Sequence, residues 1–570
     1  MSELRIGVYV CNCGTNIAHV VDAEALLAYA AELPGVAVAR GYRYMCSNPG
    51  QEMISHDIRE LGLNRVVVAA CSPRMHERTF RTACRNAGLN PYLCEMANIR
   101  EQCSWVHSDR AAATEKAKAL TRGAVLRVAR NESLEGLTAD MCPTTLVLGG
   151  GIAGLTAALE LAEGGVPVVL VEKAEQLGGN LARVDLTAPY FYSARDLLRE
   201  RLMRVQENSN VTVHLRSQLT SLTGFVGNFD AEIGGNGSST TSVRVGNVIV
   251  ATGYREFDAE RVTHFGWGKL PNVITSFEFE CMLRGGRIEM KDGRLPQYAA
   301  IIHCVGSRSA EFHGYCSRVC CMTALKYAHE IKSAVPGCYV SDLYIDMHAF
   351  GKGCEDFYRR SSEAKTLFLM YGKGERPVIR RAAAGDDCDM LIEVDEQLSG
   401  ERIEIPADLV ILMVGMEARP DAAEVAHTVN ISQDKDGWFI ESHPKLDPVA
   451  TTTDGVYIAG TCASPKDIPD SVAQARAAAG RILARIAKGK IEIDGVFAEV
   501  NEALCSGCRI CNELCPYSAI EYDLETRRSH VIPAACKACG ACVAGCPAGA
   551  IKGRHFTDAQ IFAQIEGVLV

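Results

Sequence analysis

The sequence predicts an α/β protein of several domains that ends in a small, cysteine-rich α+β domain. Short apolar runs alternate with helical stretches over most of the 570 residues. A glycine-rich loop joins an apolar run to a helix within 145–162, and two matching four-cysteine runs lie within 505–547. A chain of this length holds about three or four domains. We expect domains at 1–138, 139–497 and 498–570.

The first 138 residues show the alternation that is typical of a parallel α/β sheet. Arg5–Val10 and Arg65–Ala70 are apolar enough to be buried strands. Helical stretches flank them at Ala23–Glu32 and Gln51–Leu61. The segment Ala111–Asn131 has no proline and is rich in alanine, lysine and arginine, so we expect it to form a helix that leads out of this domain.

Cysteines follow the predicted strands of this N-terminal domain. Cys11 and Cys13 lie at the end of the first strand, Cys46 lies in a loop, and Cys71 follows Ala70. Ligands bind at the carboxyl ends of strands in such sheets, and thiolates are the ligands of [4Fe–4S] clusters. We interpret these four cysteines as candidate cluster ligands. Cys103 competes for one ligand position, and a domain with ordinary buried thiols is the alternative.

Residues 144–172 have the pattern of a dinucleotide-binding βαβ unit. The apolar run 145–148 leads into Gly149–Gly154, which reads G-x-G-x-x-G, and then into a helix. The glycines permit a tight turn and let the backbone approach a pyrophosphate at the helix N-terminus. Glu172 ends the next strand, where an acidic residue contacts the adenosine ribose.

Three further strings favour FAD over NAD as the dinucleotide. Segments 177–180, 251–253 and 453–460 resemble segments of flavoproteins of the disulfide-reductase superfamily. That superfamily usually places an aspartate soon after the last glycine, but this chain has Thr461 and Cys462 there. A Rossmann fold that binds NAD is the alternative. The residues expected to contact the dinucleotide are Gly149, Gly151, Ile152, Ala153, Gly154, Glu172, Lys173, Gly178, Gly179, Asn180, Ala251, Thr252, Gly253, Gly460, Lys466, Asp467 and Ile468.

A second Rossmann-like region is expected near 298–400, with cysteines in place of a nucleotide-binding loop. An apolar strand at Tyr298–His303 and a helical run at 322–332 enclose it. A nucleotide loop needs small residues, whereas four thiols offer a cage of soft ligands. Buried structural thiols are the alternative, and we expect His303 and His313 to support the ligands without binding metal. The candidate ligands of this third [4Fe–4S] cluster are Cys304, Cys316, Cys320 and Cys321.

The C-terminal domain carries the pattern C-x2-C-x2-C-x3-C-P twice. Bacterial ferredoxins with two [4Fe–4S] clusters have this pattern, and the fourth cysteine of each run binds the cluster of the other run. A zinc ribbon also uses C-x2-C pairs, but two complete runs that end in proline favour iron–sulfur. Residues 488–499 have the character of a short linker. The expected ligand sets are Cys505, Cys508, Cys511 and Cys546, and Cys536, Cys539, Cys542 and Cys515.

Composition narrows the class further. A total of 25 cysteines in a chain of this size indicates metal ligation and not a disulfide scaffold. The net charge of -10 disfavours nucleic acid as a partner. No apolar run approaches the roughly 20 residues that a bilayer span needs, and the N-terminus lacks the features of a signal peptide. We expect a cytoplasmic protein with no transmembrane segment.

Over nearly its whole length the chain resembles the A-subunits of heterodisulfide reductases and their relatives. The strings that carry the resemblance are Cys11-Asn-Cys13-Gly14, Tyr44-Met-Cys46-Ser47, Ala70-Cys71-Ser72-Pro73-Arg74, Ala97–His107, Gly149–Gly154, Tyr315–Cys321, Ala349–Gly353 and Pro465–Asp470.

The resemblance implies a thioredoxin-reductase-like FAD domain between an N-terminal domain and a ferredoxin domain. It also implies partner subunits of iron–sulfur and of hydrogenase or dehydrogenase type around a homodimeric core, and electron bifurcation at the flavin in some members. Lys326 resembles a lysine that lies near the flavin ring in this family. Long members carry a further ferredoxin domain inside the FAD domain. This chain has no cysteine between Gly179 and Ala251, so we expect that insertion to be missing.

Two functions fit these motifs. The first is an electron-transfer subunit that relays electrons between FAD and partner subunits through [4Fe–4S] clusters, with ferredoxin as a further partner. The second is a self-contained oxidoreductase that takes hydride from NAD(P)H and reduces a ferredoxin or a thiol or disulfide substrate. The cysteines at 304–321 argue against the second. A scaffold that only assembles a complex is a third, weaker hypothesis, which bound FAD and iron would exclude.

Overall fold

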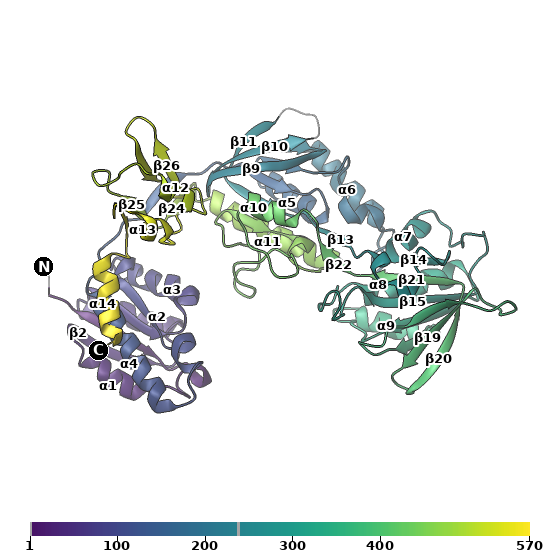
Figure 1. Cartoon of the computed structure of the whole chain (residues 1–570), viewed down its shortest axis with the longest axis horizontal. Helices are drawn as coiled ribbons and strands as arrows, with labels where there is room; N and C mark the ends of the chain where they lie inside the picture. Colours follow the sequence, from purple (N-terminus) through teal and green to yellow (C-terminus); the bar gives the residue numbers. More distant parts are fainter. Residues whose placement is uncertain (1–2, 236–239, 570) are drawn as a thin grey trace. The chain divides into compact units, whose positions relative to one another are not determined.

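The structure is a computed structural model that describes residues 3–235 and 240–569 (Figure 1). The chain forms two compact units, one from Met1–Thr138 with Glu492–Val570 and the other from Ala139–Ile491. The predicted fold class is confirmed, because parallel α/β sheets fill most of the chain and a small α+β domain ends it. Among the described helices, none combines the length and the apolar character that crossing a membrane requires.

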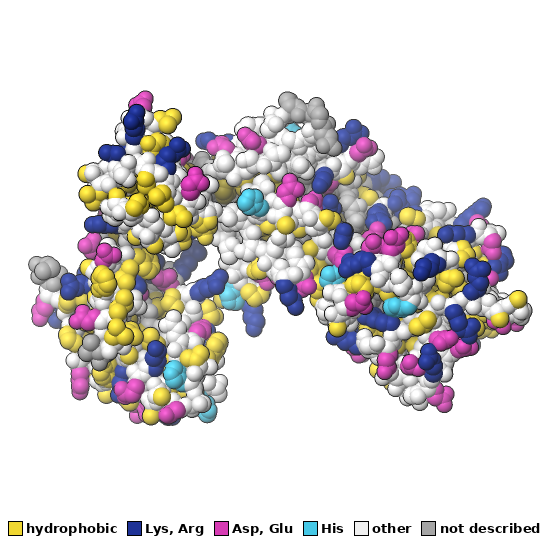
Figure 2. Space-filling view, in the orientation of Figure 1, with side chains coloured by type: hydrophobic (Ala, Val, Ile, Leu, Met, Phe, Trp, Pro, Cys, Tyr) yellow, Lys and Arg dark blue, Asp and Glu magenta, His cyan; other side chains and the backbone are white. Residues whose placement is uncertain are grey.

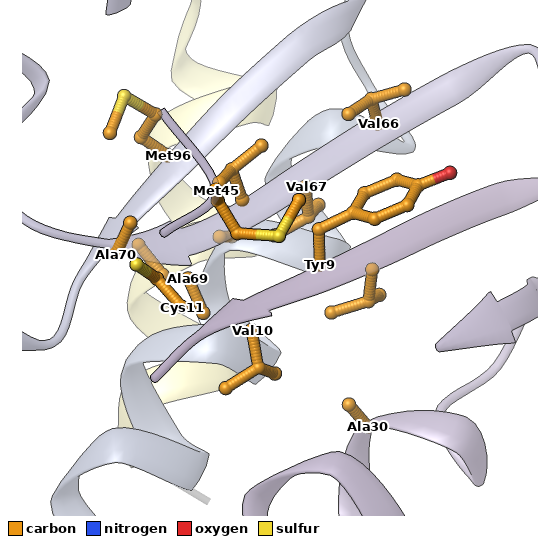
Figure 3. Packing of buried hydrophobic residues seen from close by; sticks show 14 of the residues in the cluster. Tyr9, Val10, Cys11, Ala30, Met45, Val66, Val67, Ala69, Ala70 and Met96 are labelled. Atoms are coloured by element: carbon orange, nitrogen blue, oxygen red, sulfur yellow. The ribbon is translucent and has the colours of Figure 1, made fainter. Parts of the chain in front are cut away.

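The first unit is built on a parallel sheet of four strands in the order β2-β1-β3-β4. The strands are β1 (Ile6–Cys11), β2 (Val36–Tyr42), β3 (Arg65–Ala70) and β4 (Cys94–Asn98), and the helices are α1 (Ala23–Ala31), α2 (Asn48–Glu60), α3 (Pro73–Asn86) and α4 (Arg110–Val128). The strand predicted at Arg5–Val10 is shifted by one residue, and that at Arg65–Ala70 is confirmed. Side chains of β1 and β3 pack with Met45 and Met96 in one core (Figure 3).

The C-terminal domain belongs to this same unit. Two short antiparallel ladders, β25 with β28 and β26 with β27, carry two short helices. The last helix, α14 (Asp558–Leu569), runs back along α4 (Figure 1). The elements of this domain before α14 are β25 (Ala498–Val500), α12 (Ile510–Leu514), β26 (Ile520–Asp523), β27 (Arg528–Val531), α13 (Ala541–Gly545) and β28 (Ile551–Gly553).

Two glycines let α14 approach α4 closely. A Cβ on Gly567 would lie 2.6 Å from Cα of Gly123, which is closer than real side chains come. The outer face of α14 exposes apolar side chains, which gather on the face seen in Figure 2. These exposed residues are Ile561, Phe562, Ile565 and Leu569.

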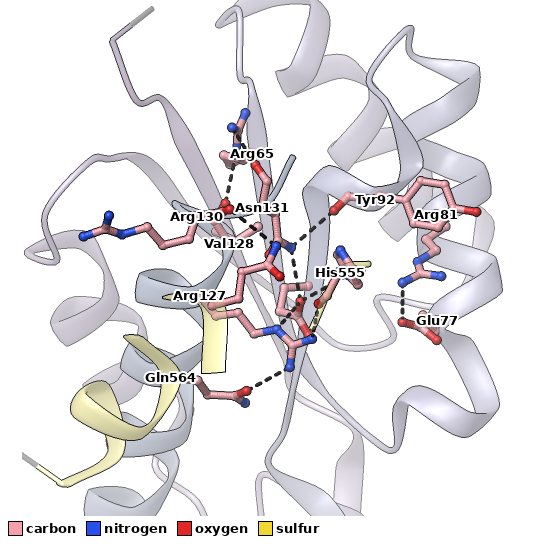
Figure 4. Close-up of polar contacts among 12 residues, drawn as sticks. Arg65, Glu77, Arg81, Tyr92, Arg127, Val128, Arg130, Asn131, His555 and Gln564 are labelled. Atoms are coloured by element: carbon pink, nitrogen blue, oxygen red, sulfur yellow. Dashed lines mark hydrogen bonds and ion pairs between the residues drawn. The ribbon is translucent and has the colours of Figure 1, made fainter. Parts of the chain in front are cut away.

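Polar contacts also join α14 and its approach segment to the N-terminal domain (Figure 4). The guanidinium of Arg127 donates to Gln564 Oε1 at 2.8 Å and to the carbonyl of His555 at 3.2 Å, and it pairs with Glu95 at 3.3 Å. The segment expected to be a linker is also held, since Tyr92 donates to Asp494 Oδ1 at 2.7 Å.

The second unit contains two parallel sheets with related strand orders. The first sheet has the order β23-β12-β6-β7-β8, and the second has the order β14-β21-β15-β16-β17. The first is built from β6 (Thr145–Leu148), β7 (Val168–Val171), β8 (Val211–His214), β12 (Asn247–Val250) and β23 (Val456–Ile458), and is covered by α5 (Ile152–Glu163) and α11 (Ile468–Ile486). An antiparallel sheet of β9 (Ser217–Phe225), β10 (Asn228–Gly235) and β11 (Thr241–Val245) follows β8.

The second sheet draws on a longer stretch than the predicted 298–400. The chain crosses into this region at β13 (Tyr254–Glu256) and returns at β22 (Met416–Ala418), and these two strands pair. The sheet comprises β14 (Val273–Thr275), β15 (Tyr298–Val305), β16 (Tyr339–Tyr344), β17 (Leu367–Met370) and β21 (Leu409–Val414), with α7 (Ser276–Arg284), α8 (Cys320–Ala334) and α9 (Cys354–Glu363). A smaller antiparallel sheet contains β18 (Val378–Arg381), β19 (Met390–Glu396) and β20 (Glu401–Ala407).

Candidate nucleotide cavity and cysteine sites

A cavity of about 910 Å³ lies within the second unit, at the carboxyl ends of the strands of its first sheet. Of the residues predicted to contact a dinucleotide, Gly149, Gly151, Ile152, Ala153, Glu172, Lys173, Gly179, Asn180, Ala251, Thr252, Gly253, Lys466, Asp467 and Ile468 line it. Gly154, Gly178 and Gly460 do not line it, although the residues beside them do. The volume is that of a site for a large ligand.

The glycines of the loop after β6 have different tasks. A Cβ on Gly154 would lie 1.8 Å from the carbonyl oxygen of Gly149, so this glycine allows α5 to pack against the loop. Gly149 has a φ of +106°, which favours glycine. A Cβ on Gly151 would meet no protein atom within 4 Å, although Gly151 lines the cavity. The backbone at Gly151 is therefore open to a ligand, as a pyrophosphate cradle requires.

Glu172 closes the end of the cavity beside the glycine loop. Its carboxylate accepts from the N–H of Gly150 at 2.6 Å and from the N–H of Ala174 at 2.8 Å. The carboxylate thus holds the loop in position at the point where a ribose hydroxyl would lie. Lys173 lines the cavity beside it and pairs with Asp421 at 3.0 Å.

The residues after β23 form part of the cavity wall. Related flavoproteins usually have an aspartate in this stretch, soon after the last glycine, and this chain has Thr461 and Cys462 there. Thr461 and Asp467 line the cavity, whereas Cys462 is buried and its thiol lies 3.2 Å from the carbonyl oxygen of Val250. Asp467 caps α11, because its side chain accepts from the N–H of Asp470 at 2.8 Å. Burial lowers the pKa of Lys466, which donates to the Ser464 hydroxyl at 2.6 Å.

Lys326 lines the far end of the cavity, on α8 of the second sheet. Its side chain is 2% exposed and pairs with Glu280 of α7, and it donates to the carbonyl of Leu186 at 2.9 Å. Tyr327 also donates to Glu280, at 2.9 Å. Glu280 was not predicted from the sequence, because no motif surrounds it and 46 positions separate it from Lys326.

The four cysteines at 304–321 come together at the carboxyl end of β15. Their thiols act on one another electrostatically, and burial together with these neighbours raises the pKa of Cys304 to about 12 and that of Cys320 as well. The pairing of β15 with β21 is irregular between Ile302 and Val305, and Cys304 itself has a φ of +57°. A bulge re-aims a side chain, and positive φ in a cysteine is a strained conformation that is typical of functional sites.

The neighbouring thiols come from a loop and from a helix start. Cys320 and Cys321 occupy the first turn of α8, where the helix N-terminus favours thiolates. The thiol of Cys316 accepts from the N–H of Arg318 at 3.3 Å and lies 3.5 Å from Nδ1 of His348. Cys320 also lines the cavity, so this group of thiols shares a wall with the nucleotide site.

The two histidines near this group behave differently. His303 is fully buried and lies 2.7 Å from Asp342, and its charge acts to lower the pKa of the Cys321 thiol. His313 instead pairs with Glu417 at 2.6 Å, and stacks on the ring of Tyr315. His348, which follows β16, was not singled out from the sequence.

The four N-terminal candidates also meet at one sheet edge. Cys11 ends β1, Cys13 follows two residues later, Cys46 follows β2, and Cys71 follows β3. Cys71 interacts with Cys11 and Cys46, and Cys11 interacts with Cys13 and Cys46. Burial, together with these neighbouring thiols, raises the pKa of Cys71 to about 11.

The thiol of Cys103 is engaged by the backbone of another element. Its thiol donates to the carbonyl of Ala113 at 3.0 Å, and the side chain is fully buried. It belongs to a single π-helical turn, Arg100–Ser104, of a kind that is frequent at functional sites. The same turn places the guanidinium of Arg100 near Cys71 and Cys13.

The ferredoxin cysteines form the two crossed sets that the spacing predicts. Cys505, Cys508, Cys511 and Cys546 line one small pocket, and the thiol of Cys542 interacts with those of Cys536, Cys515 and Cys539. The two halves repeat each other closely. The thiols of Cys515 and Cys546 each accept a backbone N–H at 3.3 Å, from Ala519 and Ala550.

A [4Fe–4S] cube requires a different arrangement of ligands from a single metal ion. Within residues 3–235 and 240–569, no group of three or more histidine, cysteine, aspartate or glutamate side chains is arranged to hold one metal ion. A [4Fe–4S] cube takes one thiolate at each of four separate iron corners, so its ligands surround a volume and do not converge on a point. The four sets of thiols have the chemistry and the number of donors for such cubes.

Comparisons with known proteins match two regions of this chain and, in several relatives, nearly its whole length. Residues 147–194 match the family described as NAD(P)-binding Rossmann-like domain, and residues 498–547 match the 4Fe-4S dicluster domain. An iron–sulfur A-subunit of CoB–CoM heterodisulfide reductase from Methanopyrus kandleri is 39% identical over 91% of both chains. The A-subunit of H(2):CoB-CoM heterodisulfide,ferredoxin reductase from Methanothermobacter marburgensis is 38% identical over 100% of this chain and 98% of its own. Thioredoxin reductase of T. acidophilum overlaps 61% of this chain and 100% of its own, with a TM-score of 0.42 and 16% identity.

The fold and its sites define an oxidoreductase with a dinucleotide-binding Rossmann domain and a 4Fe–4S dicluster domain. Its relatives match along the full chain and not in one domain alone. The chain belongs to the family of heterodisulfide reductase A-subunits, as the sequence motifs predict. The alignment with the Methanothermobacter protein runs over 652 positions, more than the 570 residues of this chain, in keeping with an insertion that this chain lacks.

Proposed function

We propose that this chain is the FAD- and [4Fe–4S]-containing electron-transfer subunit of a heterodisulfide-reductase-like complex. In this role it relays electrons between a flavin in the 910 Å³ cavity and partner subunits. The name H(2):CoB-CoM heterodisulfide,ferredoxin reductase of one relative includes two electron acceptors, a heterodisulfide and ferredoxin. We propose that the flavin of this chain also divides its electrons between two acceptors, which is bifurcation, and that ferredoxin is one of them.

One observation carries the proposal: the nucleotide cavity and a group of four thiols share a wall. Cys320 and its neighbour Val319 line the cavity, and the thiol of Cys320 interacts with those of Cys304, Cys316 and Cys321. When bound, flavin exchanges electrons in pairs and an iron–sulfur cube exchanges them singly. A cube held by these thiols would adjoin the flavin end of the cavity, where Lys326 lies.

The same wall disfavours the alternative of a self-contained NAD(P)H oxidoreductase. In a Rossmann-like sheet a second nucleotide would bind at the loop that follows β15. Thiols and the Arg308 side chain, which pairs with Asp346, fill that loop. FAD is favoured over NAD in the first sheet because the cavity runs from Glu172 to Lys326 on the second sheet.

We propose four [4Fe–4S] clusters per chain, one for each set of thiols. The N-terminal set is the one that the sequence left most open, and its support is the meeting of Cys11, Cys13, Cys46 and Cys71 at one sheet edge. The other three sets are those of the second sheet and of the ferredoxin domain.

Lys326 is the chain's own candidate for acting on the flavin. Its ammonium group is held by Glu280 and faces the cavity, so it would place a fixed positive charge beside the ring. Such a charge favours the anionic reduced ring. In the double variant Lys326→Gln/Glu280→Gln, which leaves no buried unpaired charge, we expect a lower flavin potential with FAD still bound.

The proposed relay is tested by breaking the surface cluster without removing a domain. Cys539 is exposed and belongs to a predicted ferredoxin set, so Cys539→Ser should stop partner reduction while an artificial donor still reduces the flavin. The measurement is stopped-flow reduction of purified partner subunits, with wild type and Cys388→Ser, a cysteine outside all four sets, as controls. Equal partner reduction in all three proteins would contradict exit through the ferredoxin domain. Flavin bleaching by NADPH alone would instead support the self-contained enzyme.

A further inference from the structure

The loop at the end of β15 has a backbone conformation that its own residues do not favour. Cys304 has a φ of +57° and Arg308 has a φ of +51°, and Gly306 between them has a φ of +81°. Positive φ is costly in residues other than glycine, and it persists only where the surrounding structure fixes it. The loop 304–308 carries the first of the four thiols, so the contacts that hold this loop also position a candidate cluster ligand.

The regular hydrogen bonding of the sheet ends where this loop begins. The pairing of β15 with β16 extends to Ile302, and its pairing with β21 is irregular between Ile302 and Val305. Buried carbonyl groups that leave a ladder need donors from elsewhere. These donors come from the segment 371–376, which lies between β17 and β18. Its fully buried Tyr371 donates to the carbonyl of His303 at 2.7 Å.

Arg376 supplies the remaining donors from the same segment. Its Nη1 donates to the carbonyl of Cys304 at 3.0 Å. Its Nη2 donates to the carbonyl of Ser307 at 3.1 Å and to that of Arg308 at 3.4 Å. A guanidinium offers its donors in a rigid, planar fork. One side chain therefore holds both ends of the strained loop 304–308.

The positive charge of Arg376 has only neutral groups as hydrogen-bond partners. Besides the three carbonyls, its Nη1 donates to the hydroxyl of Tyr371 at 3.4 Å. Over residues 3–235 and 240–569, no carboxylate forms an ion pair with Arg376, whereas Arg308 in the loop pairs with Asp346. Arg376 is thus the arginine that brings an uncompensated positive charge to Cys304, which is 4% exposed.

We propose that Arg376 is a positioning residue for the third cluster, which holds the loop that presents Cys304 and whose charge raises the reduction potential of the cube. This inference rests on the proposed function, because it needs that cluster. Reduction adds one electron to the cube, and a fixed cation stabilises the reduced form more than the oxidised form. The effect is larger in a buried site than in water, and the surroundings of a cube are among the factors that set its potential.

The two contributions of this side chain can be separated by substitution. Lysine keeps the charge, but its compact ammonium group lacks the planar fork that holds both ends of the loop. Glutamine keeps one donor group and has no charge. Both Arg376→Lys and Arg376→Gln lose the fork, so a purely structural role predicts the same result for the two variants. A role of the charge predicts that they differ.

The test is a redox titration of the full chain, followed by electron paramagnetic resonance, with iron per chain measured beside it. The proteins are wild type, Arg376→Lys, Arg376→Gln and a matched control. The control is Arg380→Gln, which removes a guanidinium of β18 that pairs with Glu393 at 2.8 Å. The signal of the third cluster is identified as the one that Cys316→Ser removes.

We expect Arg376→Gln to weaken the one-electron reduction of this cube about tenfold, which is about 59 mV in midpoint potential. Arg376→Lys should keep most of the wild-type potential, and Arg380→Gln should leave it unchanged. Equal midpoint potentials in Arg376→Gln and Arg376→Lys would overturn the proposal, because the charge would then have no effect on the cube.

Two further outcomes are decisive. If Arg376→Gln holds no cluster, Arg376→Lys decides, since a tenfold loss in a variant that keeps the charge would also overturn the proposal. If Cys316→Ser removes no signal, the third cluster is absent, and the proposed function fails together with this inference. A signal that Cys316→Ser removes, at a potential that Arg376→Gln leaves unchanged, would contradict this inference alone.

Discussion

The two parallel sheets of residues 139–491 carry different loops at the same position. In the first sheet, β6 is followed by three glycines and then by α5. In the second, β15 is followed by fourteen residues and then by α8, whose first two residues are cysteines. Both loops lie at the carboxyl end of a central strand, where ligands of such sheets bind.

Under the proposed function, this difference lets one architecture serve two kinds of ligand. Small residues let backbone N–H groups approach a phosphate, and Gly151 leaves that space open. A cluster instead needs side chains whose thiols reach into the site. The bulge at Cys304 and the N-terminus of α8 at Cys320 place such side chains there. Because the two sites share a wall, the second sheet can act on the ligand of the first without binding a nucleotide itself.

The sharpest way to break this comparison is to fill the space at Gly151. Its φ of -77° suits any L-residue, so Gly151→Val should fold, but its side chain would occupy the cradle. We expect flavin affinity to fall by more than tenfold, which is at least about 1.4 kcal/mol, while iron content stays unchanged. The measurement is flavin released per chain, beside iron per chain. Gly480→Val, on the exposed face of α11 with no neighbour within 4 Å, is the matched control. Full flavin occupancy in Gly151→Val would contradict the assignment of this loop.

A variant of the thiol group at 304–321 should lose its cluster and keep the flavin, which is the reverse of the result expected for Gly151→Val. Cys316→Ser is expected to lower iron by about four atoms per chain, one cube, and to leave flavin in place. Cys388→Ser, in the same region but outside the thiol group, should change neither. Parallel loss of flavin and iron in Cys316→Ser would mean that the two loops do not work as separate sites.

The N-terminal sheet extends the comparison to a third strand edge. Cys71→Ala should lower iron by about four atoms per chain, because Cys71 interacts with two of the other thiols. Cys103→Ala should leave iron unchanged, since the Cys103 thiol already donates to the backbone carbonyl of Ala113. Iron analysis of anaerobically prepared protein distinguishes the two. Equal iron in Cys71→Ala and wild type would mean that the cysteines of the N-terminal sheet are ordinary buried thiols and bind no cluster.

The sequence predicts a site well when its residues lie close together in the chain, and poorly when the fold brings distant residues together. The loop Gly149–Gly154, the two cysteine runs and the strand at Arg65–Ala70 are contiguous patterns. The structure has the strand as predicted, places the loop at the cavity and brings Cys546 of the second run to Cys505, Cys508 and Cys511 of the first. Glu280 and Asp342 carry no motif, because each gains its role only when a distant strand or helix folds beside it.

The packing of α14 on α4 could not be predicted for the same reason. It joins residues more than 400 positions apart, through two glycines and one arginine that look ordinary in sequence. The segment 488–499 therefore had the character of a linker in the sequence, although Tyr92 holds Asp494 within it.

The packing of α14 on the N-terminal domain gives the smallest of the expected effects, which is a pH dependence of its stability. His555 lies between α14 and the N-terminal domain, and burial with the nearby Arg81 and Arg127 lowers its pKa to about 4, although Glu95 lies 3.8 Å away. When this segment opens, the histidine recovers a pKa near 6.5. The open state then binds more protons, so the free energy of opening is fully present above about pH 6.5 and falls as pH drops towards 4.

Burial also raises the pKa of Glu95, which acts in the opposite sense over part of this range. The prediction is therefore a difference between wild type and His555→Gln, which keeps the volume but cannot titrate. Between pH 7.5 and 5.5, wild type should lose about 1.4 kcal/mol of opening free energy relative to the variant, about tenfold in hydrogen-exchange protection of the α14 amides. The same pH dependence in both proteins would show that His555 does not govern this contact, and Glu95 would then be the group to replace.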